Sequence, residues 1–125
     1  MKIVILGAGA VGSTLANLLS QENDLTIVDD DPIKLHKLEE ETDIKTILGG
    51  ASYPNILVNS GINDADMVVA VTGSDETNIV SCLIAKVLNN SVKTIARVRE
   101  ISYLKGKTKK ACLLYTSDAA DEGLG

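Results

Sequence analysis

An apolar run leads directly into three regularly spaced glycines near the start of the chain: Ile3-Val-Ile-Leu is followed by Gly7-Ala8-Gly9-Ala10-Val11-Gly12. In this pattern the first glycine permits the tight turn out of a strand. The second lets backbone N–H groups approach a pyrophosphate, and the third lets the next helix pack against the sheet. The positive N-terminal end of that helix would face the phosphates. The pattern predicts an adenine-nucleotide or dinucleotide site on residues 7–12; a purely structural glycine turn is the alternative.

A second apolar strand, Leu25–Val28, ends on Asp29, 22 positions beyond Gly7. An acidic side chain at that place accepts hydrogen bonds from a ribose 2′-hydroxyl. Asp30 and Asp31 follow, with no arginine nearby, so a ribose 2′-phosphate would be repelled. We therefore expect NAD(H) to be preferred over NADP(H). ATP, ADP and S-adenosylmethionine also carry a free 2′-hydroxyl and stay open as ligands.

Apolar strands alternate with amphipathic stretches along the chain, which is typical of a parallel sheet with helices on both faces. We expect five strand–helix units, and so a Rossmann-like, doubly wound α/β fold that is truncated near its sixth strand. The expected strands are 2–6, 25–28, 45–48, 67–71 and 93–98. In the helix after the second strand, Lys34 is expected to point outward. In the helix after the fourth strand, the expected buried stripe comprises Ile79, Val80, Leu83, Ile84, Val87 and Leu88.

Three further segments are expected at the carboxyl ends of the strands, where ligands bind in such sheets. Small residues around Ala51 follow the third strand and could let an adenine ring approach, or form a plain loop. Thr72 and Gly73 follow the fourth strand and could donate to the ligand, while Thr72 with Asp75 fits a helix-capping box. Arg97, near the end of the fifth strand, is suited to a phosphate or carboxylate, or to a surface ion pair.

The bulk properties exclude several classes of function. A net charge of −5 argues against a nucleic-acid partner, and no apolar run approaches the length of a membrane span. Two distant cysteines give neither a disulfide framework nor metal-ligand spacing. His36 is the only histidine and lies on an outward-facing stretch, so no catalytic residues and no metal ligands are predicted. The chain is expected to be cytoplasmic.

Residues 112–122 read Cys-Leu-Leu-Tyr-Thr-Ser-Asp-Ala-Ala-Asp-Glu and resemble the conceptual translation of a transposase-based sequencing adaptor. We therefore expect a native domain over residues 1–111 and a non-native tail over residues 112–125. On this interpretation three acidic residues carry no biological information, and the native sixth strand and any later domain are missing. A genuine C-terminus is the alternative.

Longer stretches of the sequence resemble the N-terminal, NAD-binding domain of the Trk potassium-uptake regulatory proteins, in the RCK/KTN group. The resemblance runs from Met1 to about Tyr103. It is carried by residues 2–16, by Ile62–Thr72 with its Asp-Ala-Asp-Met, by Ser74-Asp-Glu-Thr-Asn78, and by Ile95-Ala-Arg-Val-Arg99. It implies nucleotide contacts from Gly7 to Val11 and from Asp29, Thr72, Gly73 and Arg97. At Ala51 the sequence departs from the more polar run of the family.

The resemblance implies a cytosolic regulatory subunit and no enzyme. Such a subunit assembles as a homo-oligomeric ring and gates a membrane-embedded potassium translocation subunit of the TrkH type. NAD(H), with ATP and ADP as further candidates, would bind two ring conformations unequally. The alternatives are the cofactor-binding half of an NAD-dependent dehydrogenase and a free-standing nucleotide sensor. The family normally adds a regulatory domain and a second copy of the pair, neither of which is present here.

Overall fold

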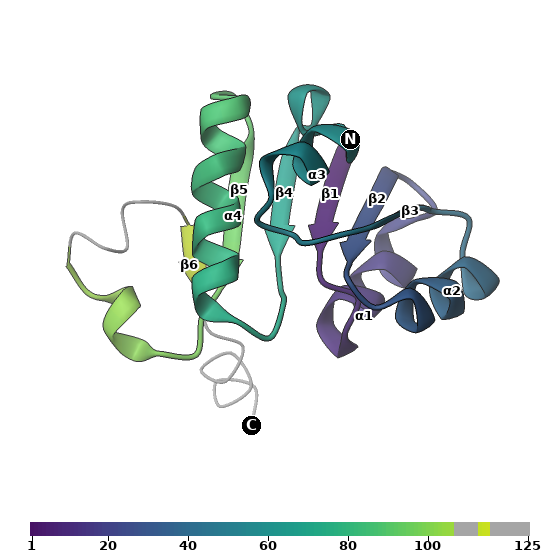
Figure 1. The fold of residues 1–125 in the computed structure, drawn as a ribbon, viewed down its shortest axis with the longest axis horizontal. Helices are drawn as coiled ribbons and strands as arrows, with labels where there is room; N and C mark the ends of the chain where they lie inside the picture. The colour runs from purple at the N-terminus through teal and green to yellow at the C-terminus, as the bar shows by residue number, and fades with distance from the viewer. Residues whose placement is uncertain (107–112, 116–125) are drawn as a thin grey trace.

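The protein forms one parallel β-sheet with helices on both faces, as seen in a computed structural model that describes residues 1–106 and 113–115 (Figure 1). The strands are β1 Lys2–Leu6, β2 Asp24–Asp29, β3 Lys45–Leu48, β4 Met67–Ala70, β5 Lys93–Arg97 and β6 Leu113–Tyr115. The helices are α1 Ala10–Leu19, α2 Pro32–Glu41, α3 Pro54–Asn59 and α4 Asp75–Leu88, with 3₁₀ turns η1 Ile62–Asp64 and η2 Ile101–Leu104. The strand order is β3-β2-β1-β4-β5-β6. β2 and β3 lie on one side of β1, and β4 pairs with its other side, so the direction of the strand order reverses between β1 and β4.

Both faces of the sheet are buried, and each face has its own hydrophobic core. Alternate residues of β1 divide between them: Val4 and Leu6 pack under α3 and α4, while Ile3 and Ile5 pack under α1 and α2. Since successive side chains of a strand point to opposite faces, a strand covered on both sides must be apolar throughout. This explains why β1 and β4 read as continuous apolar runs.

The predicted fold class and the first five strands are confirmed, with ends that differ by at most one residue. Beyond these five strands, residues of the printed C-terminal segment add a short sixth one: β6 pairs in parallel with β5, Ile95 opposite Leu113 and Arg97 opposite Tyr115. An unpaired edge of β5 would expose a row of backbone donors and acceptors, and a Leu-Leu-Tyr segment with high strand propensity satisfies them. This strand is only three residues long. The predicted domain boundary at Ala111 lies outside the described residues, as does the tail from residue 116 onward.

The predicted buried stripe of α4 is confirmed for three of its six residues: Ile79, Ile84 and Leu88 are partly buried and pack against the hydrophobic core, whereas Val80, Leu83 and Val87 are exposed. The residues of α4 that are buried are the small or polar Asn78, Ser81, Cys82 and Ala85. Val80 and Leu83 are exposed by about two fifths and Val87 by 84%. The small side chains let α4 lie close to β4 and β5, Ile79, Ile84 and Leu88 pack against the same core, and Val80, Leu83 and Val87 face outward. No helix in the described part of the chain is long and apolar enough to cross a membrane.

Candidate functional site

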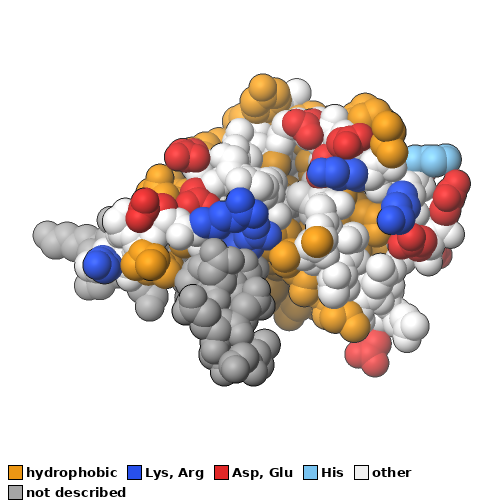
Figure 2. All heavy atoms as spheres, turned by 90° about the horizontal axis from the view of Figure 1, so that it is seen from below, with side chains coloured by type: hydrophobic (Ala, Val, Ile, Leu, Met, Phe, Trp, Pro, Cys, Tyr) orange, Lys and Arg blue, Asp and Glu red, His pale blue; other side chains and the backbone are white. Residues whose placement is uncertain are grey.

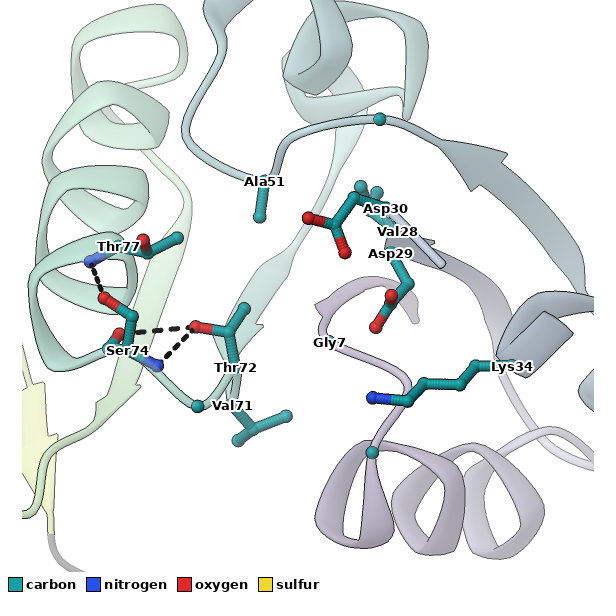
Figure 3. A pocket seen from close by; sticks show the side chains of 13 residues that line it. Gly7, Val28, Asp29, Asp30, Lys34, Ala51, Val71, Thr72, Ser74 and Thr77 are labelled. Carbon is teal, nitrogen blue, oxygen red and sulfur yellow. Dashed lines mark hydrogen bonds between the residues drawn. The ribbon is translucent and has the colours of Figure 1, made fainter. Parts of the chain in front are cut away.

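A cavity of about 390 Å³ opens at the carboxyl ends of the strands, where the strand order reverses (Figure 3). The parallel register brings the ends of β1, β2, β3 and β4 to one edge of the sheet. The lining residues come from the end of β2, from the loops after these four strands and from the first turns of α2 and α4: Gly7, Gly9, Val28, Asp29, Asp30, Lys34, Gly49, Ala51, Val71, Thr72, Gly73, Ser74 and Thr77. Figure 2 views the molecule from this edge and shows acidic and basic side chains close together on it.

The three glycines of the first loop have different structural roles. Gly7 has φ +109°, and a Cβ there would lie 2.9 Å from the backbone nitrogen of Thr72. At Gly12 a Cβ would lie 1.7 Å from the carbonyl oxygen of Gly7. Gly9 has nothing within 4 Å of such a Cβ and lines the cavity. Two glycines therefore let the chain pack on itself, and one leaves open space in front of the loop.

The N-terminus of α1 is directed at this open space. Its N-cap is Gly9, which provides no side-chain hydrogen bond to the first turn. The first N–H groups of a helix have no partner within the helix, and they carry the positive end of its dipole. An anion in front of Gly9 would satisfy them.

Asp29 lies in the cavity wall and also holds the loops around it. Its Oδ2 accepts a 2.7 Å hydrogen bond from the N–H of Ala8, and its Oδ1 accepts one of 2.8 Å from the N–H of Asp31. The carboxylate thus joins the glycine loop to the start of α2. Each carboxylate oxygen can accept more than one hydrogen bond, so the side chain retains acceptor capacity for a ligand hydroxyl.

On the opposite side of the cavity, Thr72 is bound mainly within the protein. Its N–H and its hydroxyl both donate to Oδ1 of Asn78, at 2.9 and 2.6 Å. The amide nitrogen of Asn78 donates to the carbonyl oxygens of Thr72 and Arg97, which ties β4 to β5. The predicted capping box of Thr72 with Asp75 is wrong, because the cap of α4 is Ser74, whose Oγ accepts from the N–H of Thr77. Among the described residues, none accepts a hydrogen bond from Gly73, which leaves its N–H available to a ligand.

Asp75 has a different role at the same helix end. Its carboxylate accepts hydrogen bonds of 2.9 to 3.0 Å from the N–H groups of Arg99 and Glu100. A second, more open cavity of about 550 Å³ lies beside these contacts and shares Gly73 and Ser74 with the first. Arg99 lines this second cavity. Arg97 lines neither cavity, and its side chain is nine-tenths buried.

The structure gathers most of the predicted site residues but not all. Gly7, Gly9, Asp29, Ala51, Thr72 and Gly73 line the first cavity. Ala8, Ala10, Val11 and Gly12 belong to the loop and first turn behind it, and do not line it.

Lys34 is the most consequential residue that the sequence reasoning missed. It is exposed as predicted, but it lines the cavity instead of pointing away from it. In Figure 3 its side chain extends from α2 toward the glycine loop, below Asp29. The available signal was its place in the first turn of α2: a helix that follows a parallel strand begins at the ligand-binding edge of the sheet.

The sequence model of the TrkA-N domain matches residues 3–115. The Trk system potassium uptake protein TrkA of Vibrio alginolyticus is 48% identical over 108 residues, which are 86% of this chain and 24% of that protein. The protein of the same name from Halomonas elongata is 49% identical over 108 residues, which again are 86% of this chain and 24% of that protein. The chain therefore spans about a quarter of the length of these relatives.

Solved structures share the fold. The TrkA-N domain of the inner membrane protein ybaL from Escherichia coli superposes with a TM-score of 0.85 at 17% identity, over 98% of this chain and 92% of that one. The GsuK channel bound to NAD gives 0.75 at 25% identity, over 88% of this chain and 20% of that one. GsuK bound to ADP superposes with a TM-score of 0.76 at 22% identity, over 92% of this chain and 31% of that one.

Proposed function

This chain belongs to the TrkA-N domain family, and from that premise we propose that it is the nucleotide-binding part of a regulatory subunit for potassium uptake. The observation that carries the proposal is the cavity at the reversal of the strand order, with the glycine loop on one side and Asp29 on another. The relatives named above are potassium uptake proteins by name. They favour a regulatory role over the cofactor-binding half of a dehydrogenase.

The proposed ligand is NAD(H), with ATP and ADP as further candidates. GsuK, which has this fold, has been solved with NAD and with ADP bound. In the proposed pose the phosphates lie against Gly9 and the N-terminus of α1, and the ribose hydroxyls donate to Asp29. The adenine ring lies near Ala51, where the small side chain leaves room. The N–H of Gly73 donates a hydrogen bond to the ligand from the β4 side. Arg97 does not line the cavity, so it would act on the phosphates only through its positive charge at the end of β5.

The proposed mechanism is a shift in population between two conformations of an assembly. A nucleotide that binds two states unequally favours one of them, and a coupling of about 1–3 kcal/mol is typical of such regulation. Asn78 gives the site a route outward, since it links the cavity residue Thr72 to the end of β5. We propose that the chain acts in a homo-oligomer on the cytoplasmic side of the membrane, on a potassium translocation subunit of the TrkH type. The exposed apolar residues of α4 support the association of copies.

Binding is tested by titrating NADH and NADPH into the full chain. The chain has no tryptophan, so the ligand's own fluorescence is a clean signal. We expect the wild-type protein to bind NADH more tightly than NADPH. Asp29→Ala should weaken NADH binding by about tenfold and reduce the difference in affinity between NADH and NADPH. Asp29→Asn removes the charge but keeps one oxygen that can accept a hydrogen bond from a loop N–H group. Comparing it with Asp29→Ala therefore separates the effect of the lost charge from the effect of a loosened loop. Asp43→Ala, a change of equal charge outside the cavity, serves as the control.

Equal NADH affinity in the wild-type and Asp29→Ala proteins would contradict the ribose assignment. The regulatory role is tested with a TrkH-type subunit reconstituted in vesicles together with this chain. We expect potassium flux to change on addition of NADH or ATP, and an unchanged flux would count against gating.

A further inference from the structure

Lys34 is a cation that shares the cavity with two carboxylates without pairing to either. Its side chain is exposed, and Asp29 and Asp30 line the same cavity. Within the described part of the chain, the ion pairs are Lys2 with Asp64 and His36 with Glu40, so Lys34 forms none. Both oxygens of Asp29 accept hydrogen bonds from backbone N–H groups instead. The ammonium group is therefore available to an anion from outside.

The position of Lys34 suggests which anion that is. Its side chain reaches from α2 toward the glycine loop (Figure 3). The uncapped N-terminus of α1 begins directly after this loop. An anion in front of Gly9 would thus meet partial positive charge from the helix end and a full positive charge from Lys34. These are two independent sources on two different elements.

We propose that Lys34 binds the 5′-phosphate of the nucleotide, closing the phosphate site from the α2 side. This inference rests on the proposed function and deepens it, because it divides the cavity into a cationic end and an acidic end. The acidic end, Asp29 and Asp30, accepts ribose hydroxyls and repels a 2′-phosphate. The cationic end, Lys34 with the start of α1, selects ligands that carry a 5′-phosphate. Adenosine, which lacks one, gains nothing from Lys34.

The test compares Lys34→Gln with Lys37→Gln by calorimetric titration of the full chain. Lys37 is exposed on the same helix and does not line the cavity. Lys37→Gln therefore removes the same charge from the protein without altering the cavity. For Lys34→Gln we expect about a tenfold loss of affinity for AMP, ADP and NADH, with a weaker dependence of ADP binding on salt. Adenosine binding should not change, and Lys37→Gln should behave as the wild type.

Three results would overturn the proposal: wild-type affinity for ADP in Lys34→Gln, a loss confined to NADPH, or an equal loss for adenosine. A loss confined to NADPH would place Lys34 at the 2′-position instead. If the wild-type protein binds no adenine nucleotide, it is the proposed function that fails. If it binds them and Lys34→Gln binds them equally well, only the role of Lys34 fails.

Discussion

At the scale of single residues, the space around each glycine separates folding from binding. A methyl group at Gly12 would overlap the carbonyl of Gly7, and backbone cannot move aside cheaply. A methyl group at Gly9 meets no protein atom within 4 Å but enters the cavity in front of the loop. The same chemical change therefore acts on different properties at two positions three residues apart.

We predict that Gly12→Ala lowers the free energy of unfolding by at least about 2 kcal/mol, from overpacking of the loop against α1. Gly9→Ala should cost no more than about 1 kcal/mol, mainly through a poorer helix cap. It should nevertheless weaken NADH binding, because the methyl group occupies the place where phosphate approaches the backbone. Urea unfolding and NADH titration of both variants check this pair. Undiminished NADH affinity in Gly9→Ala would contradict the phosphate position.

Asn78 shows what sequence reasoning cannot see at this scale. As one letter of Ser-Asp-Glu-Thr-Asn it resembles any polar residue of a helix start. In the structure it is 1% exposed, and its side chain takes part in four hydrogen bonds. Its Oδ1 accepts from the N–H and the hydroxyl of Thr72, and its Nδ2 donates to the carbonyl oxygens of Thr72 and Arg97. Its role depends on partners from two strands whose adjacency is a property of the sheet, not of the local sequence.

At the scale of elements, α4 presents three of its large apolar side chains, Val80, Leu83 and Val87, to solvent. Helical periodicity identifies an apolar stripe on this helix, but it does not say whether the sheet or another molecule covers it. Here the small residues lie closest to β4 and β5, and Ile79, Ile84 and Leu88 pack against the same core. Val80, Leu83 and Val87 form a separate outer stripe. Contiguous exposed apolar groups on a soluble domain mark interaction surfaces.

We predict that this outer stripe of α4 joins copies of the chain. Val87→Asp should reduce the apparent mass in sedimentation experiments, while the free energy of unfolding stays within about 0.5 kcal/mol of the wild type at this exposed site. Leu18→Asp is the matched control, since Leu18 is 72% exposed on α1, which packs on the opposite face of the sheet. A wild-type protein that sediments as a monomer, or a Val87→Asp variant that associates as before, would contradict the prediction.

At the scale of the whole molecule, the sheet order places four loops around one cavity. Loops after β1, β2, β3 and β4 are separated by up to about 65 residues in sequence, yet all of them line the site. Parallel pairing has this effect because every strand must end at the same edge.

A further prediction at this scale concerns the origin of residues 112–125. We propose that the native sequence departs from the printed one after Ala111, and that β6 is formed by residues that replace the native strand at the edge of β5. Sequencing the gene from intact genomic DNA across codon 111 checks this. We expect a reading frame that continues into a different strand sequence, and a frame that encodes residues 112–125 as printed would refute the proposal.

The sequence by itself determined the features that depend on neighbouring residues: the strand–glycine–helix unit, the buried strands, the acidic end of β2 and the membership of a family. The physical reason is that turn geometry, helix starts and continuous burial leave marks within a few positions of one another. Only the tertiary structure decided that Lys34 faces the cavity, that Ser74 caps α4, and that Asn78 joins β4 to β5. It also decided which side of α4 is covered. Each of these depends on the relative placement of elements that are distant in sequence, which packing settles and local pattern does not.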